Sequence, residues 1–135
     1  MILIDSSVWI YYYRPSGSIR IQELITTAIL EDLAAVNGII KVEILSGISR
    51  ETEYKAVESD FDGFNCFEIT ADTFKKASVT GFNLRKNGIT VPSTDLIIAA
   101  TAVENNAVLY HIDKHFGLIS KHSRLRQKNL EELIS

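Results

Sequence analysis

Cysteine and long apolar runs are scarce in this chain. Its one cysteine, Cys66, excludes an internal disulfide, indicates a reducing compartment, and is more typical of a small core residue than of a nucleophile. That cysteine and the three scattered histidines offer no zinc-site spacing. The apolar runs are too short to span a membrane, and the N-terminus lacks the pattern of a signal peptide. We therefore expect a cytoplasmic protein with no membrane segment.

The composition is that of one globular domain. The 135 residues are 46% hydrophobic and 23% charged, and no linker, repeat or low-complexity segment divides them. Periodicity predicts strands at 1–4, 33–36, 64–69 and 107–112, and helices at 6–14, 19–31, 39–47, 51–61, 70–86, 95–103 and 114–119. This alternation predicts a single α/β domain over 1–135, with a mainly parallel central sheet flanked by helices.

Three carboxylates mark the ends of predicted elements. Asp5 directly follows the first strand, and Asp113 follows the strand 107–112, in each case just before a helix. Neighbouring parallel strands open onto one crevice at their carboxyl ends, so these two acids share a cleft if their strands are adjacent. Asp95 opens a helix that is apolar nearly all round and is therefore expected at the centre of the fold.

A fourth acid, Glu43, interrupts a helical stripe made of Ile39, Ile40, Ile44 and Gly47. Burying an unpaired carboxylate is costly unless a cation or hydrogen-bond donors compensate it. We expect Glu43 to be buried and compensated by a cation. Oxygen ligands suit hard divalent ions, so the four acids together predict Mg²⁺ or Mn²⁺.

Each acid alone also has a purely structural explanation. Asp95, together with Ser93 and Thr94, could cap a helix, and Asp5 and Asp113 could be ordinary strand-end residues. Glu43 could reach solvent at the helix edge or pair with a distant arginine. The metal site is favoured because these explanations require four independent coincidences.

Basic and aromatic residues cluster in two segments. A run without acids carries Lys114, Lys121, Arg124, Arg126 and Lys128, and it predicts a phosphate-binding patch beside Asp113 in a chain of net charge −3. Arg85 and Lys86 could add to the patch, and a solvated C-terminal face is the alternative. The aromatic segment holds Trp9, Tyr12 and Tyr13, which are more typical of a core or a protein interface than of base stacking; we favour a partner interface.

The segments that carry the four acids resemble those of PIN-domain nucleases, especially the VapC-type toxins of toxin–antitoxin pairs. They are Ile2-Leu3-Ile4-Asp5-Ser6-Ser7, Val42-Glu43-Ile44-Leu45-Ser46-Gly47, Thr94-Asp95-Leu96-Ile97-Ile98-Ala99-Ala100-Thr101-Ala102 and Asp113-Lys114-His115-Phe116. No single segment is specific, but the four at these spacings are. The resemblance covers nearly the whole chain and implies one PIN-like nuclease domain.

The resemblance further implies a metal-dependent endoribonuclease. Asp5, Glu43, Asp95 and Asp113 would be both the catalytic and the metal-binding residues, holding Mg²⁺ or Mn²⁺ for hydrolysis of an RNA phosphodiester. Such an ion orients a water, lowers its pKa and stabilises charge on the phosphate. It also implies an antitoxin bound near the first helices, and a homodimer.

One position departs from the family pattern. Many members carry Thr or Ser two residues before the fourth acid, where this chain has His111. The missing hydroxyl could come from Ser6, Ser7 or Ser93.

Two other functions remain open. One is a PIN-like module that binds RNA or protein without catalysis, although the presence of all four acids argues against it. The other is an aspartate-dependent phosphatase with Asp5 as nucleophile, which lacks a second Asp two residues later. The sequence leaves the RNA substrate, the number of ions and the antitoxin's identity open.

Overall fold

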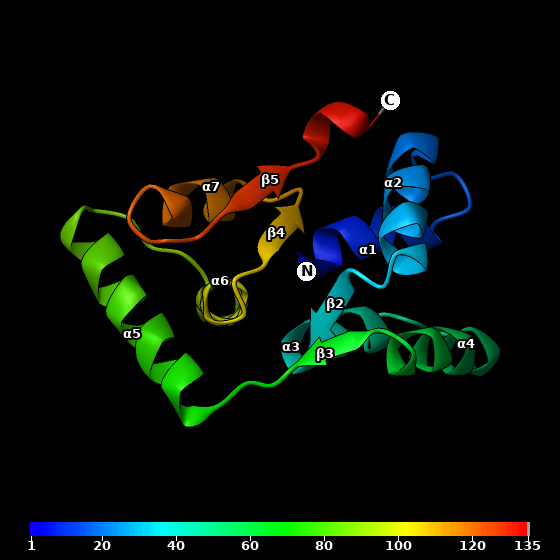
Figure 1. The fold of residues 1–135 in the computed structure, drawn as a ribbon, viewed down its shortest axis with the longest axis horizontal. Coiled ribbons are helices and arrows are strands. Elements are labelled where there is room, and N and C mark those ends of the chain that lie inside the picture. Colours follow the sequence, from blue (N-terminus) through cyan, green and yellow to red (C-terminus); the bar gives the residue numbers. More distant parts are fainter. Residues whose placement is uncertain (135) are drawn as a thin grey trace.

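A parallel sheet forms the centre of the computed structural model, which describes residues 1–134 (Figure 1). Its strands are β1 (Ile2–Ile4), β2 (Ala34–Asn37), β3 (Asn65–Phe67), β4 (Val108–His111) and β5 (Gln127–Asn129), in the order β3-β2-β1-β4-β5. Every neighbouring pair is parallel, and β1 is central, with Leu3 paired to Ala35 on one side and Leu109 on the other. The predicted α/β fold is confirmed.

Helices cover both faces of the sheet. They are α1 (Ser6–Tyr13), α2 (Ile19–Leu30), α3 (Gly38–Leu45), α4 (Glu51–Asp62), α5 (Ala71–Lys86), α6 (Ser93–Glu104) and α7 (Lys114–Ser120), followed by a 3-10 turn (Glu131–Leu133). In Figure 1, α5, α6 and α7 lie on one side of the strands and α1, α2 and α4 on the other. The arrangement is the layered packing typical of parallel sheets. None of the helices within residues 1–134 has the length and apolar character needed to cross a membrane.

The central position predicted for α6 is confirmed. Ile98, Ala99 and Ala102 are buried, and Thr101 is fully buried with its hydroxyl donating to the carbonyl of Ile97 at 2.8 Å. The same hydroxyl accepts from the side-chain Nδ2 of Asn37 at 3.2 Å, and the Oδ1 of Asn37 caps α3 by accepting from the backbone amide of Ile40. This polar link ties α6 to the carboxyl end of β2 and fixes the helix relative to the sheet.

An aromatic cluster fills the core under α1. Trp9 is fully buried, stacks on Phe64 with ring centroids 5.2 Å apart, and contacts Phe61 edge-on at 5.4 Å. Trp9 therefore belongs to the core, because its ring is packed inside the domain, and the partner interface expected for it stays a prediction. Tyr12 and Tyr13 are half-buried at the rim of the cluster, and the Tyr13 hydroxyl donates to Asp60 at 3.0 Å.

Cys66 is exposed, which contradicts the expected core position. It lies in the middle of β3, a strand at the edge of the sheet whose flanking residues Asn65 and Phe67 are half-buried. Side chains alternate between the two faces of a strand, so Cys66 points away from the side on which its neighbours are covered.

Candidate metal centre

Asp5 and Asp113 meet at the carboxyl edge of the sheet because β1 and β4 are neighbours. Ile4 pairs with Tyr110, and the amide of Asp5 continues the ladder by donating to the Tyr110 carbonyl at 3.0 Å. Each acid is the N-cap of the helix that follows, α1 for Asp5 and α7 for Asp113. The chain leaves β1 toward β2 on one side, whereas β4 lies on the other, so this is the switch point where ligands bind in open α/β sheets.

The carboxylate of Asp5 is buried and held by Ser7. The Ser7 hydroxyl and amide donate to Asp5 Oδ2 at 2.6 and 3.1 Å, and the same hydroxyl accepts from the amide of Ile112 at 3.0 Å. Burial raises the pKa of Asp5, the Ser7 hydrogen bonds oppose that rise, and the charge of Asp113 adds to it. Ser7 thus joins the ends of β1 and β4 around one carboxylate.

Asp95 reaches the same place from the first turn of α6. It is 7% exposed, and its Oδ2 lies 3.1 Å from His115 Nδ1. Burial and the charges of Asp113 and Asp5 raise its pKa to about 6, against a smaller opposing effect of His115. The helix-capping explanation fails for Asp95, since the N-cap is Pro92 and its end of α6 has no side-chain cap among residues 1–134.

His115 completes this group and was not predicted as a site residue. Its Nδ1 lies 3.0 Å from Asp113 Oδ1 as well as 3.1 Å from Asp95 Oδ2. One donor atom from each of the three side chains falls within 4.8 Å of the others, close enough to share one cation. The sequence feature that could have pointed to His115 is its place two residues after Asp113. In the structure its backbone amide donates to Asp113 Oδ1 at 2.9 Å.

Glu43 stands at the rim of the cluster. The hydroxyl of Ser6 donates to Glu43 Oε1 at 3.1 Å. Glu43 is exposed while Ile40 and Ile44 on α3 are buried, so the prediction of a buried Glu43 is wrong and the alternative of a solvent-facing helix edge is right. Its pKa is nevertheless raised, first by partial loss of solvent and then by the charges of Asp5 and Asp113. The charges of Asp5 and Asp113 thus act on Glu43 as well as on Asp95.

The sequence profile of the PIN domain family matches residues 2–121. This chain belongs to the PIN domain family. Its PIN domain is 33% identical over 130 residues to the VapC ribonuclease Mb1587 of Mycobacterium bovis, covering 93% of this chain and 96% of the relative.

Solved structures share the fold. FitAcB from Neisseria gonorrhoeae superposes with a TM-score of 0.78 at 18% identity, covering 96% of this chain and 97% of that one. VapBC-5 of Mycobacterium tuberculosis, a member of the VapBC family of toxin-antitoxin systems, gives 0.69 at 15% identity, with 94% and 96% covered.

The polar residues of this PIN domain that were expected to assist the four acids divide into two sets. Ser6 and Ser7 bind the acids, whereas the side chains of Ser93 and Thr94 make no hydrogen bond within residues 1–134. His111 is fully buried, and its ring nitrogens lie against the side chain of Gln127 and the backbone amide of Asp113 rather than against a carboxylate oxygen. The hydroxyls of Ser6 and Ser7, which hydrogen-bond to the acids, thus come from the start of α1.

The basic residues do not form one patch beside Asp113, which corrects that prediction. All five are exposed. Arg126 directly precedes β5 and so lies at the amino ends of the strands, opposite the carboxyl ends where Asp113 stands. There its Nη2 donates to the Asn106 carbonyl at 2.7 Å and to the Asn106 Oδ1 at 3.0 Å. Lys128 lies over the Tyr110 ring at 5.7 Å, and Lys121 ends α7. Among these side chains, Lys114 is the one adjacent to an acid in sequence.

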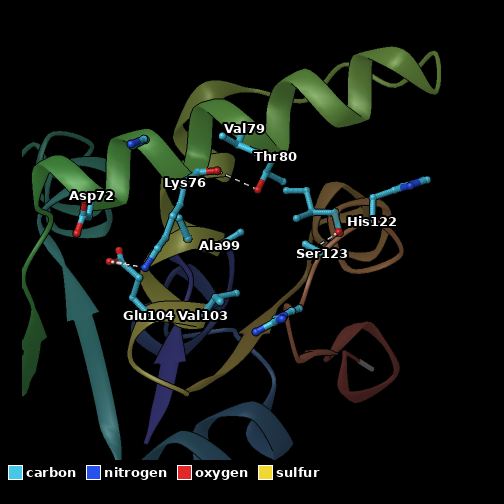
Figure 2. A pocket seen from close by; sticks show the side chains of 13 residues that line it. Asp72, Lys76, Val79, Thr80, Ala99, Val103, Glu104, His122 and Ser123 are labelled. Atoms are coloured by element: carbon cyan, nitrogen blue, oxygen red, sulfur yellow. Dashed lines mark hydrogen bonds and ion pairs between the residues drawn. The ribbon is translucent and has the colours of Figure 1, made fainter.

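Arg124 lies at a different hollow. A cavity of about 770 Å³ lies between α5, α6 and the end of α7. It is lined by Val79, Thr80, Ala99, Val103, His122 and Ser123 among others, whose side chains Figure 2 shows. Lys76 crosses it to reach Glu104 at 3.3 Å. None of the four acids lines this cavity. Helix α5 also carries three exposed apolar side chains, Phe74, Val79 and Phe82. Their exposure alone does not show a contact between two copies of the chain, so the homodimer stays a prediction.

Proposed function

We propose that this PIN domain is a metal-dependent endoribonuclease whose Asp5, Glu43, Asp95 and Asp113 hold Mg²⁺ or Mn²⁺. The observation that carries the proposal is the convergence of these carboxylates at the switch point of the sheet, with burial and mutual repulsion raising the pKa of Asp5, Glu43 and Asp95. The 33% identity to a VapC ribonuclease supports RNA as the substrate.

The donor set fits a hard divalent cation. Like-charged carboxylates in a partly buried cluster are stable together only if protonated or paired with positive charge. Oxygen donors dominate the group, and His115 adds one nitrogen near Asp95 and Asp113. Asp5, Glu43, Asp95 and Asp113 would hold such a cation, which would supply positive charge for the scissile phosphate and lower the pKa of a water bound to it.

The surrounding residues orient the carboxylates. Ser7 fixes Asp5 through two hydrogen bonds, Ser6 holds Glu43, and His115 bridges Asp95 and Asp113. Lys114, exposed beside Asp113, supplies positive charge where an RNA phosphate would approach. The acids are thereby held in fixed positions before substrate binds.

Cleavage of RNA is expected to stop in excess EDTA, with a fall of at least about 100-fold, because the charge compensation on the phosphate is worth several kcal/mol. Added Mg²⁺ or Mn²⁺ should restore it. The measurement is cleavage of a labelled RNA by the purified protein, and an Asp113→Asn protein purified in the same way controls for contaminating nuclease. Undiminished cleavage in EDTA by the wild type would sink the proposal.

A protein partner is also proposed, in the groove between α1, α3 and α4. The groove has a volume of about 360 Å³ and is lined by Ile10, Tyr13, Ile44, Gly47, Ile48 and Val57 among others. Glu43 lines it too, so an occupant would touch the acid cluster. The likeness to a toxin–antitoxin structure supports an antitoxin segment as the occupant.

Ile10→Glu should prevent complex formation with the proposed antitoxin, because it sets a charge in a mainly apolar groove. Ile10 is 46% exposed, so the fold should tolerate the change. The control is Ile19→Glu on α2, which is 69% exposed and outside the groove. Co-purification of the two proteins measures the effect; equal recovery with both variants would remove the groove from the interface.

A further inference from the structure

We propose that His111 is a positioning residue that fixes the backbone of Asp113 and connects it to the edge strand β5. His111 is the last residue of β4 and is fully buried. The amide of Asp113 lies 3.1 Å from its Nδ1, and the side-chain oxygen of Gln127 on β5 lies 2.5 Å from its Nε2. The inference rests on the proposed function only in giving Asp113 a role in the metal site.

The two partners fix which ring nitrogen carries the proton. A backbone amide can only donate, so Nδ1 must be the unprotonated acceptor. Nε2 then carries the hydrogen and donates to the Oε1 of Gln127. The ring is held as one neutral tautomer, with both nitrogens satisfied inside the core.

Packing fixes the ring from a third direction. The Phe116 ring on α7 lies 5.1 Å from the His111 ring, and α7 is the helix that Asp113 caps. The carbonyl of His111 accepts from the amide of Leu130, just beyond β5, at 2.8 Å. On its other side Asp113 is held by His115. A shift of the His111 ring would therefore move the turn that carries the Asp113 carboxylate.

A pair of isosteric variants separates positioning from core packing. The Oδ1 of His111→Asn lies near the former Nδ1 and can still accept from the Asp113 amide, whereas the amide of His111→Gln replaces Nε2 and leaves that backbone amide unpaired. We expect the Asn variant to keep kcat within about 3-fold of wild type and the Gln variant to lose about 10- to 100-fold, with KM for RNA unchanged.

Stability should change in the opposite order. Asparagine is smaller and cannot reach Gln127, so His111→Asn should have the lower melting temperature of the two. Activity that instead falls in step with melting temperature, with the Asn variant worse than the Gln variant, would show that His111 only fills the core and would overturn the proposal. Gln127→Met is a second test that keeps the ring and its bond to the Asp113 amide; it removes the partner of Nε2 and should give an intermediate loss of kcat.

Two readouts do not depend on RNA cleavage. Long-range ¹⁵N NMR of the wild type should show the Nε2-protonated tautomer, and hydrogen exchange of the Asp113 amide should be slow in wild type and His111→Asn but fast in His111→Gln. Should the wild type neither bind Mn²⁺ nor cleave RNA, the proposed function fails while the exchange experiment still decides the positioning. Equal exchange of the Asp113 amide in both variants, or an Nδ1-protonated ring, would overturn the proposal.

Discussion

Asp95→Asn is expected to lower kcat/KM for RNA at least about 100-fold while the protein stays folded. Asparagine has nearly the same shape as aspartate, but it removes one of the negative charges that face the proposed cation. Asp95 is the acid whose position local structure explains least, because it is buried in the first turn of α6 without capping the helix. Cleavage of a labelled RNA at saturating Mg²⁺ measures the effect, and circular dichroism checks the fold.

Asp72→Asn is the matched control. Asp72 also stands in the first turn of a helix, α5, but it is exposed and lies outside the cluster. Each substitution removes one charge from the first turn of a helix, so a helix-dipole effect would be shared by both. Asp72→Asn should keep wild-type activity. Wild-type activity in Asp95→Asn would take Asp95 out of the site, and equal losses in both would point to the helix ends instead.

The metal-free protein is expected to lose stability as the pH rises from about 4 to above 6. The pKa of Asp95 is raised from 3.8 in a free side chain to about 6 in the folded protein. Across that window the folded state keeps a proton that the unfolded chain has released, so the free energy of unfolding falls as the pH rises. Burial raises the pKa of Asp5 in the same direction.

Urea unfolding at pH 4, 5, 6 and 7 in EDTA measures this loss. Carboxylates elsewhere in the chain affect wild type and Asp95→Asn alike, so the difference between the two proteins isolates the cluster. The variant should become more stable relative to wild type as the pH rises. Mg²⁺ at about 100 times its Kd should add about 2.7 kcal/mol to the wild type at pH 7. Parallel pH profiles for the two proteins would contradict the raised pKa of Asp95.

The parts of the site that follow from local sequence were predictable. β1 and β4 are short apolar runs, and an acid directly after each run marks the carboxyl edge of the sheet. β5 was missed because Gln127–Asn129 is polar and has no alternating apolar pattern; only its pairing with β4 makes it a strand. Because β5 pairs in parallel with β4, its start lies at the amino ends of the strands, so Arg126 is separated from the acids at the carboxyl ends.

Two side chains depended on contacts that a sequence pattern does not contain. Glu43 lies on a helix of only eight residues, where one step of 100° separates buried Ile44 from an exposed position facing Ser6. His115 contacts Asp95, twenty residues earlier in the chain, because α6 packs beside α7. Both placements are tertiary, so helical periodicity alone could not give them.

Anomalous diffraction from crystals soaked in Mn²⁺ tests the central claim most directly. The account predicts a peak within coordination distance, about 2.0–2.3 Å, of carboxylate oxygens from Asp5, Asp95 and Asp113, with Glu43 at the rim. The peak should disappear in Asp95→Asn crystals grown in the same form. A Mn²⁺ peak elsewhere, or none at these acids in a wild-type protein that still cleaves RNA, would contradict it.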